Sequence, residues 1–192
     1  ALDYLASLSH GLIRPEMAEI FVKTGSELID WMETRTPLHL RLVPGFPDYH
    51  PEHPGGKPGG GRSLEPELFS FCELGEWADR FVGYTRPMYV TETPIGGGTG
   101  FIDPEVEQER RSRRIEGLGR AMVGALLKGC LDHGVEPVTG ARGRELLVED
   151  GRVVGVRIQT TDGEYDVRAT RGVILATGGF EWDESLSRAF LR

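Results

Sequence analysis

Four small residues near the carboxyl end of the chain can bring bare backbone close to a bulky anionic ligand. They are Ala176, Thr177, Gly178 and Gly179. The two glycines have no Cβ to hold a ligand away, and the Thr177 hydroxyl can donate to a phosphate oxygen or accept from a backbone N–H. A plain glycine turn after a core strand is the alternative interpretation, so the surrounding elements have to decide between the two.

The residues just before this turn predict a buried strand. Residues 173–176 are apolar with no polar alternation, which is typical of a strand covered on both faces in a parallel α/β sheet. Open sheets of that kind bind their ligands at the carboxyl ends of the strands. The position of the four small residues is therefore compatible with a ligand site as well as with a plain turn.

A helix and several short strands lead into that predicted strand. Apolar residues at helical spacings predict a helix from Arg120 to His133, ended by Gly134, and then a short strand over Val135–Thr139. Asp-Gly turn signals divide a predicted β-meander, 144–169, into strands at 144–149, 153–160 and 164–169. This order is typical of an α/β dinucleotide-binding domain in which a meander replaces a crossover helix.

The first half of the chain is helical and then rich in glycine and proline. Apolar spacing predicts an amphipathic helix over 16–33, which Pro15 starts. The prolines and glycines of 44–61 exclude regular structure and predict a long shaped loop. A second glycine-rich segment, 94–100, precedes a charged helix expected within 103–116. It lacks the Lys-Ser/Thr ending of a P-loop, which favours a flexible or tightly turned connection over a phosphate cradle.

Composition indicates a soluble globular protein that binds no nucleic acid. The chain has 192 residues, 39% of them hydrophobic, and a formal net charge of -8, whereas nucleic-acid surfaces need clustered Lys and Arg. The basic run 110–114 lies among glutamates and predicts a solvated helix face. Cys72 and Cys130 show no metal or disulfide spacing, which fits a reducing cytoplasm. No apolar run approaches the roughly 20 residues of a membrane span.

Several motifs together resemble one family of flavoenzymes. The chain is similar to the FAD-dependent oxidoreductases grouped with fumarate reductase and succinate dehydrogenase flavoproteins and the 3-ketosteroid dehydrogenases. The resemblance rests on segments 117–119, 134–136, 148–156 and 172–180, which occur in the family's order. Segments 47–50, 54–56 and 60–63 are similar to the ketosteroid branch. The resemblance implies an FAD-binding α/β domain interrupted by a substrate-covering domain.

One departure from the family pattern changes the interpretation. Family members begin with a strand ending in GxGxxG and carry an acidic residue after the next strand, and neither feature occurs here. We therefore interpret the chain as an internal piece of a flavoenzyme, with FAD binding weak or absent in isolation. Residues 1–116 are expected toward the substrate side, and 117–192 are expected to form part of the FAD-binding domain, with the meander at 144–169.

The resemblance also implies which residues lie near the cofactor. Residues 176–179 would lie against FAD, where only small residues permit close approach. The main chain of Arg142 and Gly143 would pair with the adenine edge. Gly117 and Gly119 precede a helix whose amino terminus could face anionic groups, although helix-entry turns use glycine as well.

Three polar residues are the candidates for substrate chemistry. Oxidation or reduction of a C–C bond beside a carbonyl or carboxylate needs hydride exchange with the flavin, a proton donor or acceptor, and hydrogen bonds to the developing enolate. Tyr49, His50 and Arg62 lie on the Pro/Gly-rich loops where functional side chains tend to occur. In the alternative interpretation, Arg62 pairs with a carboxylate such as Glu65 and His50 faces solvent.

No metal site is predicted, because the other histidines show no ligand-like companions; they are His10, His39, His53 and His133. The expected substrate is a steroid-like enone or a dicarboxylate. The absence of Arg/His pairs that would clamp two carboxylates favours the ketosteroid branch. The competing hypothesis is a non-catalytic binding or interaction module that keeps half of a flavoprotein fold. In an isolated fragment, an uncovered sheet edge also predicts self-association.

Overall fold

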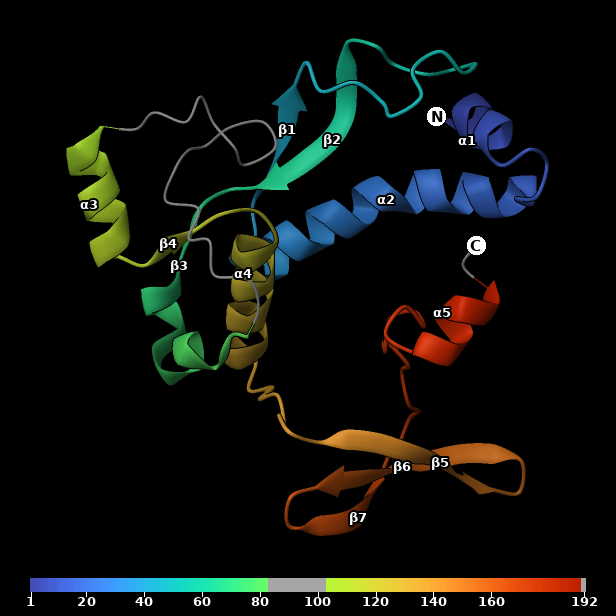
Figure 1. The fold of residues 1–192 in the computed structure, drawn as a ribbon, viewed down its shortest axis with the longest axis vertical. Helices are drawn as coiled ribbons and strands as arrows, with labels where there is room; N and C mark the ends of the chain where they lie inside the picture. Colours follow the sequence, from blue (N-terminus) through green and yellow to red (C-terminus); the bar gives the residue numbers. More distant parts are fainter. Residues whose placement is uncertain (83–102, 191–192) are drawn as a thin grey trace. The chain divides into compact units, whose positions relative to one another are not determined.

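The chain folds into two compact units. The computed structural model describes residues 1–82 and 103–190, and the units comprise Ala1–Glu136 and Pro137–Arg192 (Figure 1). The predicted glycine-rich connection at 94–100 lies outside the described residues. The expected mixture of helices and strands, including the meander, is confirmed.

The first unit contains most of the described helices. The predicted amphipathic helix is α2, Pro15–Arg35, with Pro15 in its first turn, where a missing N–H costs nothing. The charged helix is α3, Pro104–Ser112, capped by the Asp103 carboxylate, which accepts from the Glu105 N–H. The unit also contains α1, Leu2–Leu8; the 3-10 helix η1, Phe71–Arg80; and α4, Leu118–Asp132.

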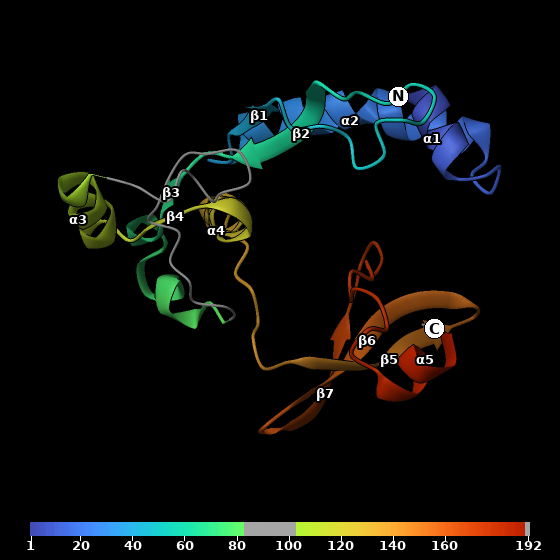
Figure 2. The same ribbon diagram turned by 45° about the horizontal axis from the view of Figure 1, so that its top comes forward.

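The first unit also contains two antiparallel pairs of strands. Strand β1, Leu40–Pro44, pairs with β2, Gly60–Pro66, and β3, Phe69–Ser70, pairs with β4, Ile115–Glu116. Residues 45–59 (the 45–59 loop) connect β1 to β2. They correspond to the shaped loop predicted over 44–61. The loop lies beside α1 (Figure 2). Its His50 N–H donates to the Tyr4 hydroxyl, and its His53 Nδ1 is hydrogen-bonded to the Ser7 hydroxyl.

The core of the first unit lies where α4 packs against η1 and β3. Phe71 is 0% exposed, and its ring lies 4.7 Å from that of Phe81. A Cβ built on Gly124 of α4 would lie 2.8 Å from a ring carbon of Phe71 and 3.0 Å from one of Phe69. Glycine at position 124 therefore sets how closely the helix approaches the two rings.

We expect Gly124→Ala to lower the free energy of unfolding by about 1–2 kcal/mol. Crowding two buried rings costs more than the gain of about 1 kcal/mol in helix propensity. Gly119→Ala is the matched control in the same helix, because its Cβ would meet no atom within 4 Å; it should leave stability unchanged or raise it slightly. Urea unfolding measures both variants, and equal stabilities would contradict the prediction.

The second unit is built on the predicted β-meander. Its strands are β5, Arg142–Glu149; β6, Arg152–Thr160; and β7, Gly163–Arg168, paired antiparallel in that order. Asp150 and Gly151 both have positive φ, 48° and 75°, as the tight hairpin turn predicted from Asp-Gly requires. Helix α5, Glu184–Phe190, follows near the carboxyl end.

Two predicted strands are not formed. Residues 135–139 and 173–176 have no strand structure, and Ile174 is 93% exposed. A strand exists only when a neighbour pairs with its N–H and C=O groups. The described strands of the second unit pair with one another inside the meander, so the two segments have no partner there.

Over the described ranges, we find no helix that is both long and apolar enough to cross a bilayer.

Candidate functional site

The predicted site residues fall in both units. Tyr49, His50, Arg62, Gly117 and Gly119 belong to the first unit, whereas Arg142, Gly143 and residues 176–179 belong to the second.

Arg62 holds the 45–59 loop in shape. Its Nη1 donates to Asp48 Oδ2 at 2.8 Å, and its Nη2 donates to the Gly55 carbonyl at 2.6 Å. Its guanidinium carbon also lies 5.1 Å from the centre of the Tyr4 ring. The alternative interpretation, that Arg62 pairs with a carboxylate, was correct in kind, but the partner is Asp48. Glu65 pairs instead with Arg41, at 2.7 Å.

Asp48 connects the two sides of the same loop. Its carboxylate accepts from Arg62 and also from the Lys57 N–H at 2.8 Å, while its own N–H donates to the Lys57 carbonyl at 3.1 Å. The Asp48 side chain is only 9% exposed, so its charge is compensated by a cation and an N–H instead of by water. The loop is consequently preorganised by charge-assisted hydrogen bonds.

Tyr49 lies on the 45–59 loop, which the Arg62–Asp48 pair stabilises. The residue is 87% exposed, and its ring packs edge-on against Phe46 with 6.2 Å between centroids. Among residues 1–82 and 103–190, no protein group bonds to its hydroxyl. A phenol in this setting can donate a hydrogen bond to a carbonyl oxygen or exchange a proton with it.

His50 lies beside Glu52 and His53. Its Nδ1 is 3.2 Å from Glu52 Oε1, and its side chain is 60% exposed, so the expectation of a solvent-facing His50 describes it in part. The backbone N–H of Glu52, with help from His50, lowers the pKa of the Glu52 carboxyl below its ordinary value. No companion of His53 is predicted from the sequence, although the spacing His50-x-Glu52-His53 was a signal that could have revealed this cluster.

Gly117 and Gly119 differ in their surroundings. Gly117 is buried and is the N-cap residue of α4, and its carbonyl accepts from the Ala121 N–H at 3.2 Å. Gly119 is exposed in the first turn. Between them, Leu118 has a φ of 50°, which is unfavourable for a residue with a Cβ.

Leu118 also lines a small cavity of about 170 Å³. The lining is mainly apolar and consists of Val43, Phe46, Ser63, Leu64, Glu65 and Leu118. Pockets that enclose a drug-sized ligand usually have volumes of about 300–1,000 Å³. This cavity could therefore hold only a part of a ligand as large as a steroid.

The residues predicted to touch the cofactor present open backbone in the second unit. Residues 174–180 are exposed, and a Cβ at Gly178 would meet no atom within 4 Å. Gly178 has a φ of 77°, which by itself favours glycine. The open backbone and the Thr177 hydroxyl fit a large flat or anionic ligand, whereas the glycine alone would also fit a plain turn.

Arg142 and Gly143 lie at the beginning of β5 and not after a separate short strand. Arg142 pairs in register with Gln159 and Gly143 with Ile158. Both residues are exposed. Their predicted main-chain contact with an adenine edge stays a prediction.

Comparisons with known proteins place the chain among flavin-binding sequences. A family model described as "FAD binding domain" matches residues 1–190. The chain is 33% identical to a 4-oxocyclohexanecarboxylate 2-dehydrogenase of Sinomonas cyclohexanicum and 31% identical to a 3-oxosteroid 1-dehydrogenase of Mycobacterium tuberculosis. These alignments include 100% of this chain but 34% and 38% of the relatives, so the chain spans about a third of their length.

A solved structure shares the fold. The crystal structure of 3-ketosteroid delta1-dehydrogenase from Sterolibacterium denitrificans, in complex with 1,4-androstadiene-3,17-dione, matches with a TM-score of 0.82 at 24% identity. The match covers 98% of this chain and 38% of that chain. At this identity the similarity shows that the fold is the same.

Proposed function

This chain belongs to the FAD binding domain family, and from that membership we propose that it is part of an FAD-dependent dehydrogenase that acts on a cyclic ketone. The observation that carries the proposal is the chemistry shared by the two named relatives, each aligned over the whole chain. Both names describe the dehydrogenation of a ring that bears a ketone. A steroid-like ring ketone is thus the favoured substrate class.

The two names also agree on where the ring is oxidised. A 3-oxo compound is dehydrogenated at position 1 and a 4-oxo compound at position 2, so in both cases the new double bond joins the carbons α and β to the carbonyl. Removing a proton from the α carbon places negative charge on the carbonyl oxygen. Bound FAD supplies the acceptor for the hydride from the β carbon.

Residues of this chain have distinct roles in the proposal. Tyr49 donates a hydrogen bond to the carbonyl oxygen, which stabilises the negative charge that develops there. Arg62 and Asp48 do not contact the substrate in this proposal; they hold the loop on which Tyr49 lies. Residues 176–179 would form a wall of the FAD site, since the open backbone at Gly178 leaves room for a large ligand and the Thr177 hydroxyl could hydrogen-bond to it.

The experiment is a flavin and substrate test on the full-length protein. We expect it to purify with about one FAD per chain and to lose the yellow absorption, without oxygen, when a 3-ketosteroid or 4-oxocyclohexanecarboxylate is added. A 3-hydroxysteroid that lacks the ketone is the matched control, and succinate tests the dicarboxylate alternative. The isolated 192-residue chain should bind FAD weakly or not at all.

The outcomes separate the competing functions. A full-length protein that is colourless and unaffected by FAD would contradict the dehydrogenase and support a non-catalytic module. Bleaching by succinate alone would replace the ring ketone by a dicarboxylate. Bleaching by at least one of the two ketones, but not by the hydroxysteroid, is the result that the proposal requires.

A further inference from the structure

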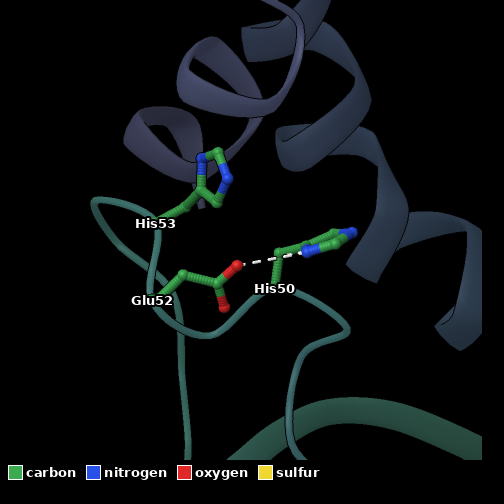
Figure 3. A group of neighbouring side chains, drawn as sticks. All are labelled: His50, Glu52 and His53. Atoms are coloured by element: carbon green, nitrogen blue, oxygen red, sulfur yellow. Dashed lines mark hydrogen bonds and ion pairs between the residues drawn. The ribbon is translucent and has the colours of Figure 1, made fainter.

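The 45–59 loop gathers three side chains that can act as metal ligands. His50, Glu52 and His53 each place one ligand atom within 4.8 Å of the other two (Figure 3). His50 Nδ1 lies 3.2 Å from Glu52 Oε1, and the two imidazole rings are 5.8 Å apart at their centroids. The side chains of His50 and Glu52 are 60% and 65% exposed, so an ion from solution can reach them.

The backbone holds these three residues in place without a metal. The His53 N–H donates to the His50 carbonyl at 3.1 Å, and the Gly56 N–H donates to the His53 carbonyl at 2.8 Å. A Cβ on Gly56 would lie 2.4 Å from the Pro51 carbonyl oxygen, so this turn is too tight for another residue. Together with the Arg62–Asp48 pair, these bonds already order the loop, so ion binding would cost less conformational entropy.

His53 and His50 have further bonds to α1 that suit metal ligands. His53 Nδ1 lies 2.8 Å from the Ser7 hydroxyl oxygen. When Nδ1–H donates to this oxygen, Nε2 keeps the lone pair that binds a metal, and metal-binding histidines usually have such an outer partner. The His50 N–H is likewise held by the Tyr4 hydroxyl, at 3.2 Å.

We propose that His50, Glu52 and His53 bind one Zn²⁺ ion. Two imidazoles and one carboxylate form a ligand set that zinc accepts, with water in the fourth position of the tetrahedron. Mg²⁺ and Ca²⁺ prefer sets made only of oxygen. The ion would fasten the 45–59 loop to α1 through Ser7 and steady the segment that carries Tyr49. This site goes beyond the proposed dehydrogenase, because hydride transfer to FAD needs no metal.

The test is a calorimetric titration of the metal-stripped, full-length protein with zinc chloride. A Cys72→Ser/Cys130→Ser background removes the two exposed thiols, which would also bind zinc. We expect one zinc per chain, and we expect His50→Ala/His53→Ala to weaken binding at least about 100-fold, because two of three ligands are lost. His39→Ala, which removes an exposed histidine outside the cluster, is the matched control and should bind like the parent.

Ser7→Ala tests Ser7 as a positioning residue. Loss of an outer partner usually weakens metal binding by about 10–100-fold, so this variant should lie between the parent and the double variant. Co²⁺ used in place of zinc adds a visible absorption that reports the coordination. That absorption should be retained in Ser7→Ala and lost in the double variant.

Three results would overturn the proposal. They are the absence of a one-site isotherm, an isotherm unchanged in His50→Ala/His53→Ala, or an equal loss of binding in His39→Ala. Circular dichroism and melting of the metal-free variants control for folding. If the double variant unfolds, Glu52→Gln takes its place, since it keeps the side-chain shape and removes the charged ligand. Unchanged zinc binding in that variant would equally contradict the site.

Discussion

Tyr49→Phe is expected to lower kcat of the full-length dehydrogenase proposed here by about 10²–10⁴-fold, which is the usual contribution of a positioned proton donor or acceptor. The change removes one oxygen and keeps the ring that packs against Phe46. Because the Tyr49 hydroxyl has no protein partner within the described residues, its loss leaves no group of the described structure unpaired. The effect on folding stability should therefore be small.

The kinetic pattern of this variant distinguishes chemistry from binding. An interaction made mainly in the transition state lowers kcat and kcat/KM together, with KM little changed. Steady-state rates with a 3-ketosteroid and an artificial electron acceptor measure both constants. Tyr165→Phe, which removes the hydroxyl of an exposed residue in β7, is the matched control and should keep the parental kcat. A Tyr49→Phe variant with the parental kcat would remove Tyr49 from the proposed site.

Phe71→Ala should lower the free energy of unfolding by about 3–5 kcal/mol, as for other fully buried phenylalanines. The ring is 0% exposed and contacts Phe69 and Phe81. The Arg120 guanidinium carbon also lies 4.9 Å from its centre, so a cation–π contact is lost together with the packing. Helix α4 already lies close to the Phe71 ring at Gly124, which limits how far the surrounding residues can move into the cavity left by Phe71→Ala.

Phe21→Ala on α2 provides the comparison for this prediction. Phe21 is 71% exposed, and surface substitutions usually change stability by less than about 0.5 kcal/mol. Urea unfolding with a common slope measures the two variants. The assignment of Phe71 to the centre of the core would be contradicted if both variants lost the same stability.

Helices and hairpins were predictable because their signals are local. The spacing of Met17, Ile20 and Phe21 with Pro15 predicted α2 to within two residues at each end. Asp150-Gly151 predicted a turn whose two residues do adopt positive φ. In each case neighbours within about four positions carry the information.

Strands that need distant partners were not predictable in the same way. Residues 173–176 have the composition of a buried strand, yet residues 174–176 are exposed and the segment is unpaired within the second unit. An apolar composition indicates that a segment can be buried in a sheet. The strand forms only when neighbouring strands pair with its N–H and C=O groups. The same reason explains the missing strand at 135–139.

The candidate site also combines features that the sequence predicted with side-chain contacts that only the tertiary structure formed. The amino-acid sequence by itself determined helices α2, α3 and α4, the meander, the shaped loop and the family, since these depend on short-range periodicity, turn residues and ordered motifs. Only the tertiary structure decided that Arg62 pairs with Asp48 and not Glu65, and that His53 meets Ser7. The Ser7–His53 contact depends on how the loop closes onto a helix 46 residues earlier in the chain, and the Arg62–Asp48 pair depends on how the loop folds back on itself. No local pattern encodes either closure.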